Sequence, residues 1–67
     1  MGMDDTMVKM VADAYDETVA EAMAQGHPAD IAHKEGVTAA AMFLSSMTGT
    51  EDAAARAQIE GLGLTPN

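Results

Sequence analysis

The feature that most constrains the fold is an uncharged stretch that runs from Gly36 to Met47. A helix turns about 100° per residue, so Ala32 and the apolar residues of this stretch share one flank that covers more than half of the circumference. An ordinary surface helix shows a narrower apolar stripe. We therefore expect this helix to be covered on at least two sides, through the following residues: Ala32, Gly36, Val37, Ala39, Ala40, Ala41, Phe43, Leu44 and Met47.

A chain of 67 residues has little material with which to cover such a helix. Fourteen of its hydrophobic residues are alanine, and it has no cysteine with which to form a disulfide. Self-association is the remaining common source of stability for so small a domain. We expect an obligate homodimer or higher oligomer without a stably folded monomer, held together by Ala32, Gly36, Val37, Ala40, Phe43, Leu44 and Met47.

Two long helices are predicted, over residues 5–25 and 28–48. Gly26 and Gly49 follow them and suit a left-handed helix end. Pro28 fits the first position of the second helix, where its missing N–H costs nothing. So short a connection makes the two helices an antiparallel hairpin.

A short third helix is predicted over residues 51–60, with Thr50 as its N-cap and Gly61 at its end. Its apolar side is thin, with Ala55 and Ile59 one turn apart, so we expect it to dock onto the hairpin. The predicted fold is therefore all-α. Residues 1–67 form one domain, a long antiparallel hairpin plus a short third helix, assembled as a homo-oligomeric helical bundle.

Eleven acidic and three basic residues give a net charge of -8. This charge repels nucleic acids and anionic membranes, so neither is an expected partner. Asp13, Glu17 and Glu21 form an acidic row along one face of the first helix. The row is interpreted as a solvated face, with a docking surface for a basic protein as the alternative. No segment reaches the about 20 apolar residues of a membrane span, and we expect a cytoplasmic protein.

Two histidines and an aspartate follow one another at helical spacing, as His27, Asp30 and His33. His33 falls within the apolar arc, and Asp30 lies three residues earlier, where its carboxylate can hold the imidazole. Two such segments that face each other across a dimer axis could bind a metal ion. Packed or rim histidines are the favoured interpretation.

Small residues repeat every four positions at Ala32, Gly36 and Ala40, which predicts close packing against another helix. We expect Gly36→Leu to disrupt that contact and Gly36→Ala to be mild or stabilising if a methyl group fits. Met10 and Met42 fall near polar sectors of their helices. An adaptable interface and gap-filling core are equally open interpretations of these two methionines.

No catalytic or cofactor motif is recognisable in the chain, and neither histidine is placed to activate Ser45 or Ser46. We therefore expect a non-enzymatic interaction or structural protein, or a small accessory subunit, that binds no cofactor. The alternative is a small-molecule or metal-binding module with a site near His33 at a subunit interface.

Overall fold

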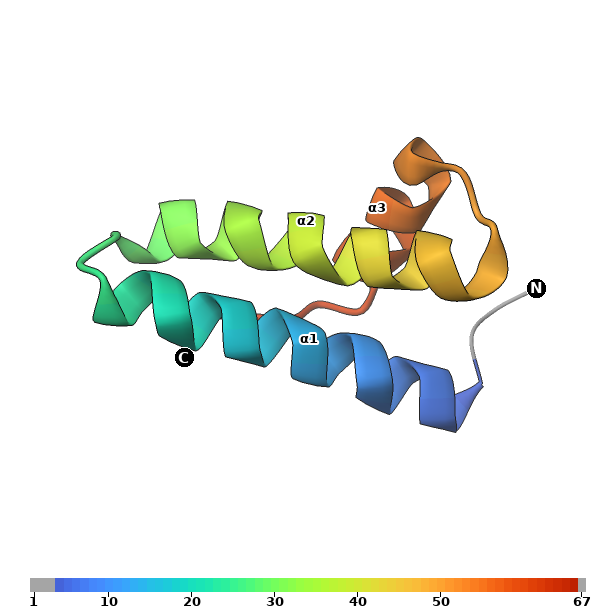
Figure 1. Cartoon of the computed structure of the whole chain (residues 1–67), viewed down its shortest axis with the longest axis horizontal. Helices are drawn as coiled ribbons and strands as arrows, with labels where there is room; N and C mark the ends of the chain where they lie inside the picture. The colour runs from blue at the N-terminus through green and yellow to red at the C-terminus, as the bar shows by residue number, and fades with distance from the viewer. Residues whose placement is uncertain (1–3, 67) are drawn as a thin grey trace.

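The computed structural model describes residues 4–66 and contains three helices, α1 (Asp5–Ala24), α2 (Ala29–Thr48) and α3 (Asp52–Gly61). Each helix begins and ends within one residue of the position predicted from the sequence. In Figure 1, α1 and α2 lie side by side and antiparallel, and α3 lies against α2. The all-α prediction and the hairpin are therefore confirmed, whereas the assembly into an oligomer stays a prediction.

The ends of the two long helices follow from local chemistry. The Asp4 carboxylate accepts a hydrogen bond of 2.8 Å from the Met7 N–H, which satisfies one free donor in the first turn of α1. Gly26 and Gly49 follow α1 and α2 with φ angles of 93° and 75°, a left-handed conformation that glycine adopts without steric cost. Pro28 immediately precedes α2 in extended conformation instead of forming its first residue.

Two predictions about the ends of α3 are wrong. Glu51 stands at the N-cap position without a side-chain bond, because the Thr50 hydroxyl pairs with the Thr48 hydroxyl at 2.6 Å. Gly61 is still helical, and the left-handed turn comes at Gly63, with a φ of 72°. The left-handed turn therefore comes two residues after the last helical residue of α3.

The hydrophobic core lies between α1 and α2 and beneath α3. Ile59 of α3 and Leu44 of α2 are almost fully buried, and Tyr15 of α1 is completely buried. In Figure 1 the segment after α3 runs back behind the hairpin, and Leu62 and Leu64 pack against the core. The full core comprises Val11, Tyr15, Val19, Ala22, Ala32, Val37, Ala40, Ala41, Leu44, Ala55 and Ile59.

α1 and α2 pack closely against each other at Gly36. A Cβ atom at this position would lie 2.7 Å from ring atom Cδ1 of Tyr15 and 2.7 Å from Cγ2 of Val19. Real Cβ atoms essentially never make contacts that short. The predicted close packing against another helix is therefore observed at Gly36, with α1 of the same chain as the neighbour, and Ala32 and Ala40 are fully buried. From the sequence, Gly36→Ala is expected to be mild if a methyl group fits. The structure leaves no space for that methyl group, so this condition is not met.

Candidate functional site

Tyr15 and His33 form the only side-chain hydrogen bond between α1 and α2 in the part of the chain that the structure describes. The Tyr15 hydroxyl oxygen lies 2.6 Å from Nδ1 of His33, and the two rings meet edge to face with centroids 5.6 Å apart. The bare backbone of Gly36, one turn after His33, gives the phenol ring room to approach α2 closely. This small polar contact sits at the edge of an otherwise apolar core.

Burial, and secondarily the negative charge of Asp16, raises the pKa of Tyr15 above its usual value of 10.0. The phenol therefore keeps its proton at neutral pH and can donate it to Nδ1 of His33. In that arrangement Nε2 carries the imidazole proton. Nε2 has no hydrogen-bond partner among residues 4–66 and is not one of the buried unpaired atoms, so it is open to solvent.

The predicted relationship between Asp30 and His33 is wrong. The Asp30 carboxylate is exposed and makes no hydrogen bond within residues 4–66, because the His33 ring turns toward Tyr15 instead. Nδ1 of His27 pairs with the Glu35 carboxylate at 3.1 Å. Among the described residues, no group of three or more histidine, aspartate or glutamate side chains could hold a metal ion. A metal site formed by His27, Asp30 and His33 of two chains stays a prediction.

A shallow groove of about 400 Å³ lies beside His33, where the C-terminal segment passes the start of α2. We call it the tail groove. It combines apolar walls with a carboxylate, an imidazole and an ammonium group, a mixture typical of small-molecule sites. Its lining residues are Ala29, Asp30, His33, Lys34, Leu64, Thr65 and Pro66.

The residues predicted to hold an oligomer together fall into two groups. Phe43 is half-buried and Met47 is 53% exposed. The other five are buried inside the single chain, where α1 and α3 cover them, so a second copy cannot reach them in this fold. Those five are Ala32, Gly36, Val37, Ala40 and Leu44.

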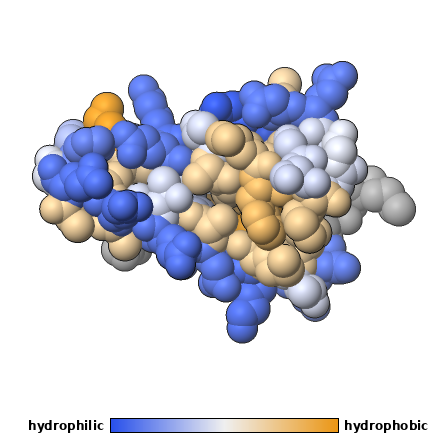
Figure 2. Space-filling model, viewed as in Figure 1, coloured by the Kyte–Doolittle hydropathy of each residue, from blue (hydrophilic) through white to orange (hydrophobic). Residues whose placement is uncertain are grey.

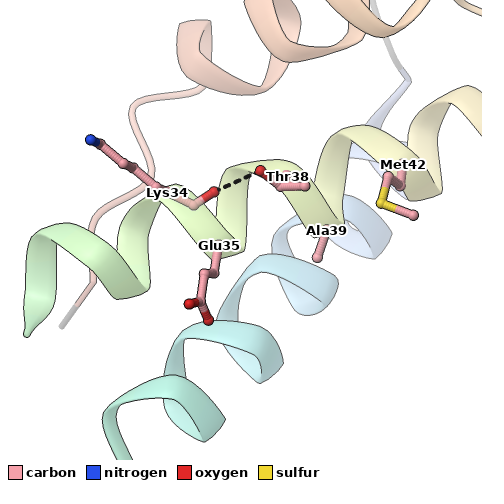
Figure 3. A pocket seen from close by; sticks show the side chains of 5 residues that line it. All are labelled: Lys34, Glu35, Thr38, Ala39 and Met42. Carbon is pink, nitrogen blue, oxygen red and sulfur yellow. Dashed lines mark hydrogen bonds between the residues drawn. The ribbon is translucent and has the colours of Figure 1, made fainter. Parts of the chain in front are cut away.

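The opposite face of α2 carries a second hollow, of about 280 Å³, which we call the outer hollow. Figure 3 shows the side chains of its lining residues Lys34, Glu35, Thr38, Ala39 and Met42 along α2. Met42 is 62% exposed, the largest value among the exposed large hydrophobic residues within positions 4–66. This exposure favours the interface interpretation of Met42.

Figure 2 shows that apolar surface gathers where the C-terminal half of α2 lies beside the N-terminal half of α1. Met42 and Met47 belong to that half of α2, and no charged residue occurs between Gly36 and Thr50. The acidic row Asp13, Glu17 and Glu21 is exposed along α1. The molecule therefore presents distinct apolar and acidic surfaces.

Sequence reasoning missed both the Tyr15–His33 contact and the outer hollow. The first had a signal, because a tyrosine on an apolar helix face needs a partner for its hydroxyl, and His33 lies on the facing apolar arc. The outer hollow also had a signal in the sequence. Glu35, Thr38, Ala39 and Met42 have the i, i+3, i+4, i+7 spacing of neighbours on one helix face.

Comparison of this chain with protein-family models, curated protein sequences and solved structures gives no match. Within the described residues, no helix is both long and apolar enough to cross a membrane. Function therefore has to be argued from the surfaces of the molecule.

Proposed function

We propose that this chain is a small non-enzymatic interaction protein, a structural component or accessory subunit, that binds its partner through the outer face of α2. The observation that carries this proposal is the 62% exposure of Met42 beside an unfilled hollow. The fold already uses the inner face of the same helix for its core. An exposed apolar face is therefore what this helix offers to another molecule.

Methionine is well suited to such a surface. Its unbranched, polarisable side chain adapts to differently shaped partners. Contiguous exposed apolar surface on a small protein commonly marks an interaction site. The absence of charge from Gly36 to Thr50 removes the cost of burying an ionised group in this part of the surface.

The test is native mass spectrometry of the endogenous complex from lysate, with wild type compared with Met42→Glu. We expect the wild type to appear in a complex that Met42→Glu loses. Met23→Glu is the matched control, because Met23 is 42% exposed on α1 and lies away from the outer hollow. A wild-type chain that appears only as a free monomer would overturn the proposal.

The tail groove supports a second candidate, a small-molecule or metal-binding module. The observation that favours it is the solvent-accessible Nε2 of His33 beside Asp30 and Lys34, with Leu64 as an apolar wall. Titration with hexanoate, hexylamine or Zn²⁺ should shift the NMR signals of the His33 ring in a saturable way. Binding of Zn²⁺ at Nε2 requires the imidazole proton to move to Nδ1, from which it can be donated to the Tyr15 hydroxyl oxygen. Leu64→Ala should weaken binding of the organic probes, and His33→Ala should remove Zn²⁺ binding. Shifts that fail to saturate with all three probes would exclude this function.

A further inference from the structure

The outer hollow has the form of a receptor for one side chain of another helix. Its residues Glu35, Thr38, Ala39 and Met42 occupy positions i, i+3, i+4 and i+7 of α2. Four residues in this arrangement make the hole into which a neighbouring helix inserts a knob in knobs-into-holes packing. Thr38 and Ala39 form a low centre, and Figure 3 shows the longer Glu35 and Met42 at either end.

We propose that the occupant is a second copy of this chain, whose α2 packs antiparallel against this α2 so that each Met42 enters the outer hollow of the other. The inference rests on the proposed function, since it names the partner of the same surface. Met42 has the properties of a knob because it is exposed, unbranched and adaptable. A two-fold symmetric contact of this kind uses the same patch on both copies.

The register of this dimer follows from the helix geometry. The centre of the outer hollow lies at the level between Thr38 and Ala39. When Met42 of the other copy reaches that level, the two-fold axis passes at the level of residues 40–41. Lys34 of each copy then lies opposite residues 46–47 of the other, in the last turn of α2.

Charge complementarity supports this register. Lys34 makes no ion pair among residues 4–66, and the last turn of α2 contains no basic residue of its own. The C-terminal end of a helix carries partial negative charge and is stabilised by a nearby cation. In the proposed dimer, Lys34 of the second copy supplies that cation.

Like charges do not meet in the contact, although each copy carries a net charge of -8. Glu35 lies opposite the uncharged residues 45–46 of the other copy, and its carboxylate is already paired with His27 of its own chain. Residues 36–50, which form the rest of the contact on α2, carry no charge. The Arg56 guanidinium of α3 donates a hydrogen bond to the Thr38 hydroxyl at the outer hollow, and it is paired with Asp52 of its own chain. The acidic row lies on α1, outside the proposed contact.

The test measures the mass of the purified full-length chain by sedimentation equilibrium from about 1 μM to about 1 mM, a range that spans transient and stable association. We expect the mass to rise from 6.9 kDa to twice that value. Met42→Lys should remain monomeric, because it brings two ammonium groups together at the contact. Met23→Lys is the matched control and should dimerise like the wild type. Lys34→Glu should raise the dissociation constant of the dimer about tenfold.

Cross-linking tests the orientation, because the chain has no cysteine of its own. A mixture of Glu35→Cys and Ser46→Cys should form the mixed disulfide, whereas a parallel dimer would give 35–35 and 46–46 disulfides instead. Circular dichroism verifies that every variant is folded.

A monomer at all concentrations, a Met42→Lys variant that still dimerises, or parallel disulfides would overturn the inference. If the purified chain is monomeric but its complex in lysate still depends on Met42, the proposed function stands and the partner is a different protein. A complex that is independent of Met42 overturns both.

Discussion

The two faces of α2 are both largely uncharged, yet they have different roles. The inner face, through Gly36 and Leu44, packs against α1 and α3 and is almost fully buried. The outer face, through Ala39 and Met42, borders an open hollow. The difference shows that when apolar residues cover more than half of a helix's circumference, the fold need not bury all of them. The fold buries the inner side, whereas Met42 on the outer side remains exposed to solvent.

The largest effect on the free energy of unfolding is expected from side-chain truncation on the inner face of α2. Truncation on the outer face of the same helix provides the comparison. Leu44 is 1% exposed, and Leu44→Ala should lower the free energy of unfolding by about 2–5 kcal/mol through lost burial and a cavity. Met42→Ala, on the outer face of the same helix, should change it by less than about 0.5 kcal/mol at concentrations where the chain is monomeric. Urea unfolding followed by circular dichroism measures both. Equal losses would contradict the division of α2 into two faces.

Gly36→Ala tests how tightly the inner face is packed. The added methyl group would clash with Tyr15 and Val19, and overpacking of this kind costs about 1–3 kcal/mol. The better helix propensity of alanine offsets about 1 kcal/mol of that cost, so a net loss is expected in thermal unfolding. Gly61→Ala is the matched control, because it is helical with nothing within 4 Å of its Cβ position and should be neutral or stabilising. A stabilised Gly36→Ala variant would show that the Tyr15 ring can move aside.

Tyr15→Phe removes the hydroxyl that links α1 to His33 and should cost about 1 kcal/mol, the usual net value of such a hydrogen bond. It should also change the response to alkaline pH. Because burial raises the pKa of Tyr15, the folded state holds the phenol proton more tightly than the unfolded state, whose pKa is near 10.0.

The stabilisation from this proton is therefore complete below about pH 10 and is lost as pH rises toward the higher folded-state pKa. Urea unfolding from pH 8 to pH 11 should show a steeper decline for wild type than for Tyr15→Phe. The two proteins differ in no other ionisable group, so every other source of pH dependence is shared and serves as the internal control. Parallel declines would mean that the Tyr15 hydroxyl is not buried in solution.

The smallest effect is expected at the exposed pair of His27 and Glu35. Their atoms lie 3.1 Å apart, but both side chains are well exposed to solvent, and such pairs contribute about 0–1 kcal/mol. Glu35→Gln should change the free energy of unfolding by less than about 0.5 kcal/mol at neutral pH. A loss as large as that of Leu44→Ala would place Glu35 in the structural core of the hairpin.

Much of the fold could be predicted because its signals are local. Gly26 and Gly49 favour the end of a helix whatever the tertiary structure is. Val11, Tyr15 and Val19 share one helix face by periodicity alone. Thr50 failed as a cap because a neighbouring hydroxyl, that of Thr48, competes for it. The partner of His33 could not be chosen locally, since Asp30 is near in sequence and Tyr15 is near only after the hairpin closes.

The sequence by itself therefore determined the helices, their turns and the apolar width of α2, because these depend on backbone preference and spacing. Only the tertiary structure decided which part of that width is core. The angle at which α1 and α3 lie on α2 buries Gly36 and Leu44 and leaves Met42 in solvent. Helical periodicity gives the direction of each side chain but not the position of the neighbouring helices, and burial depends on both.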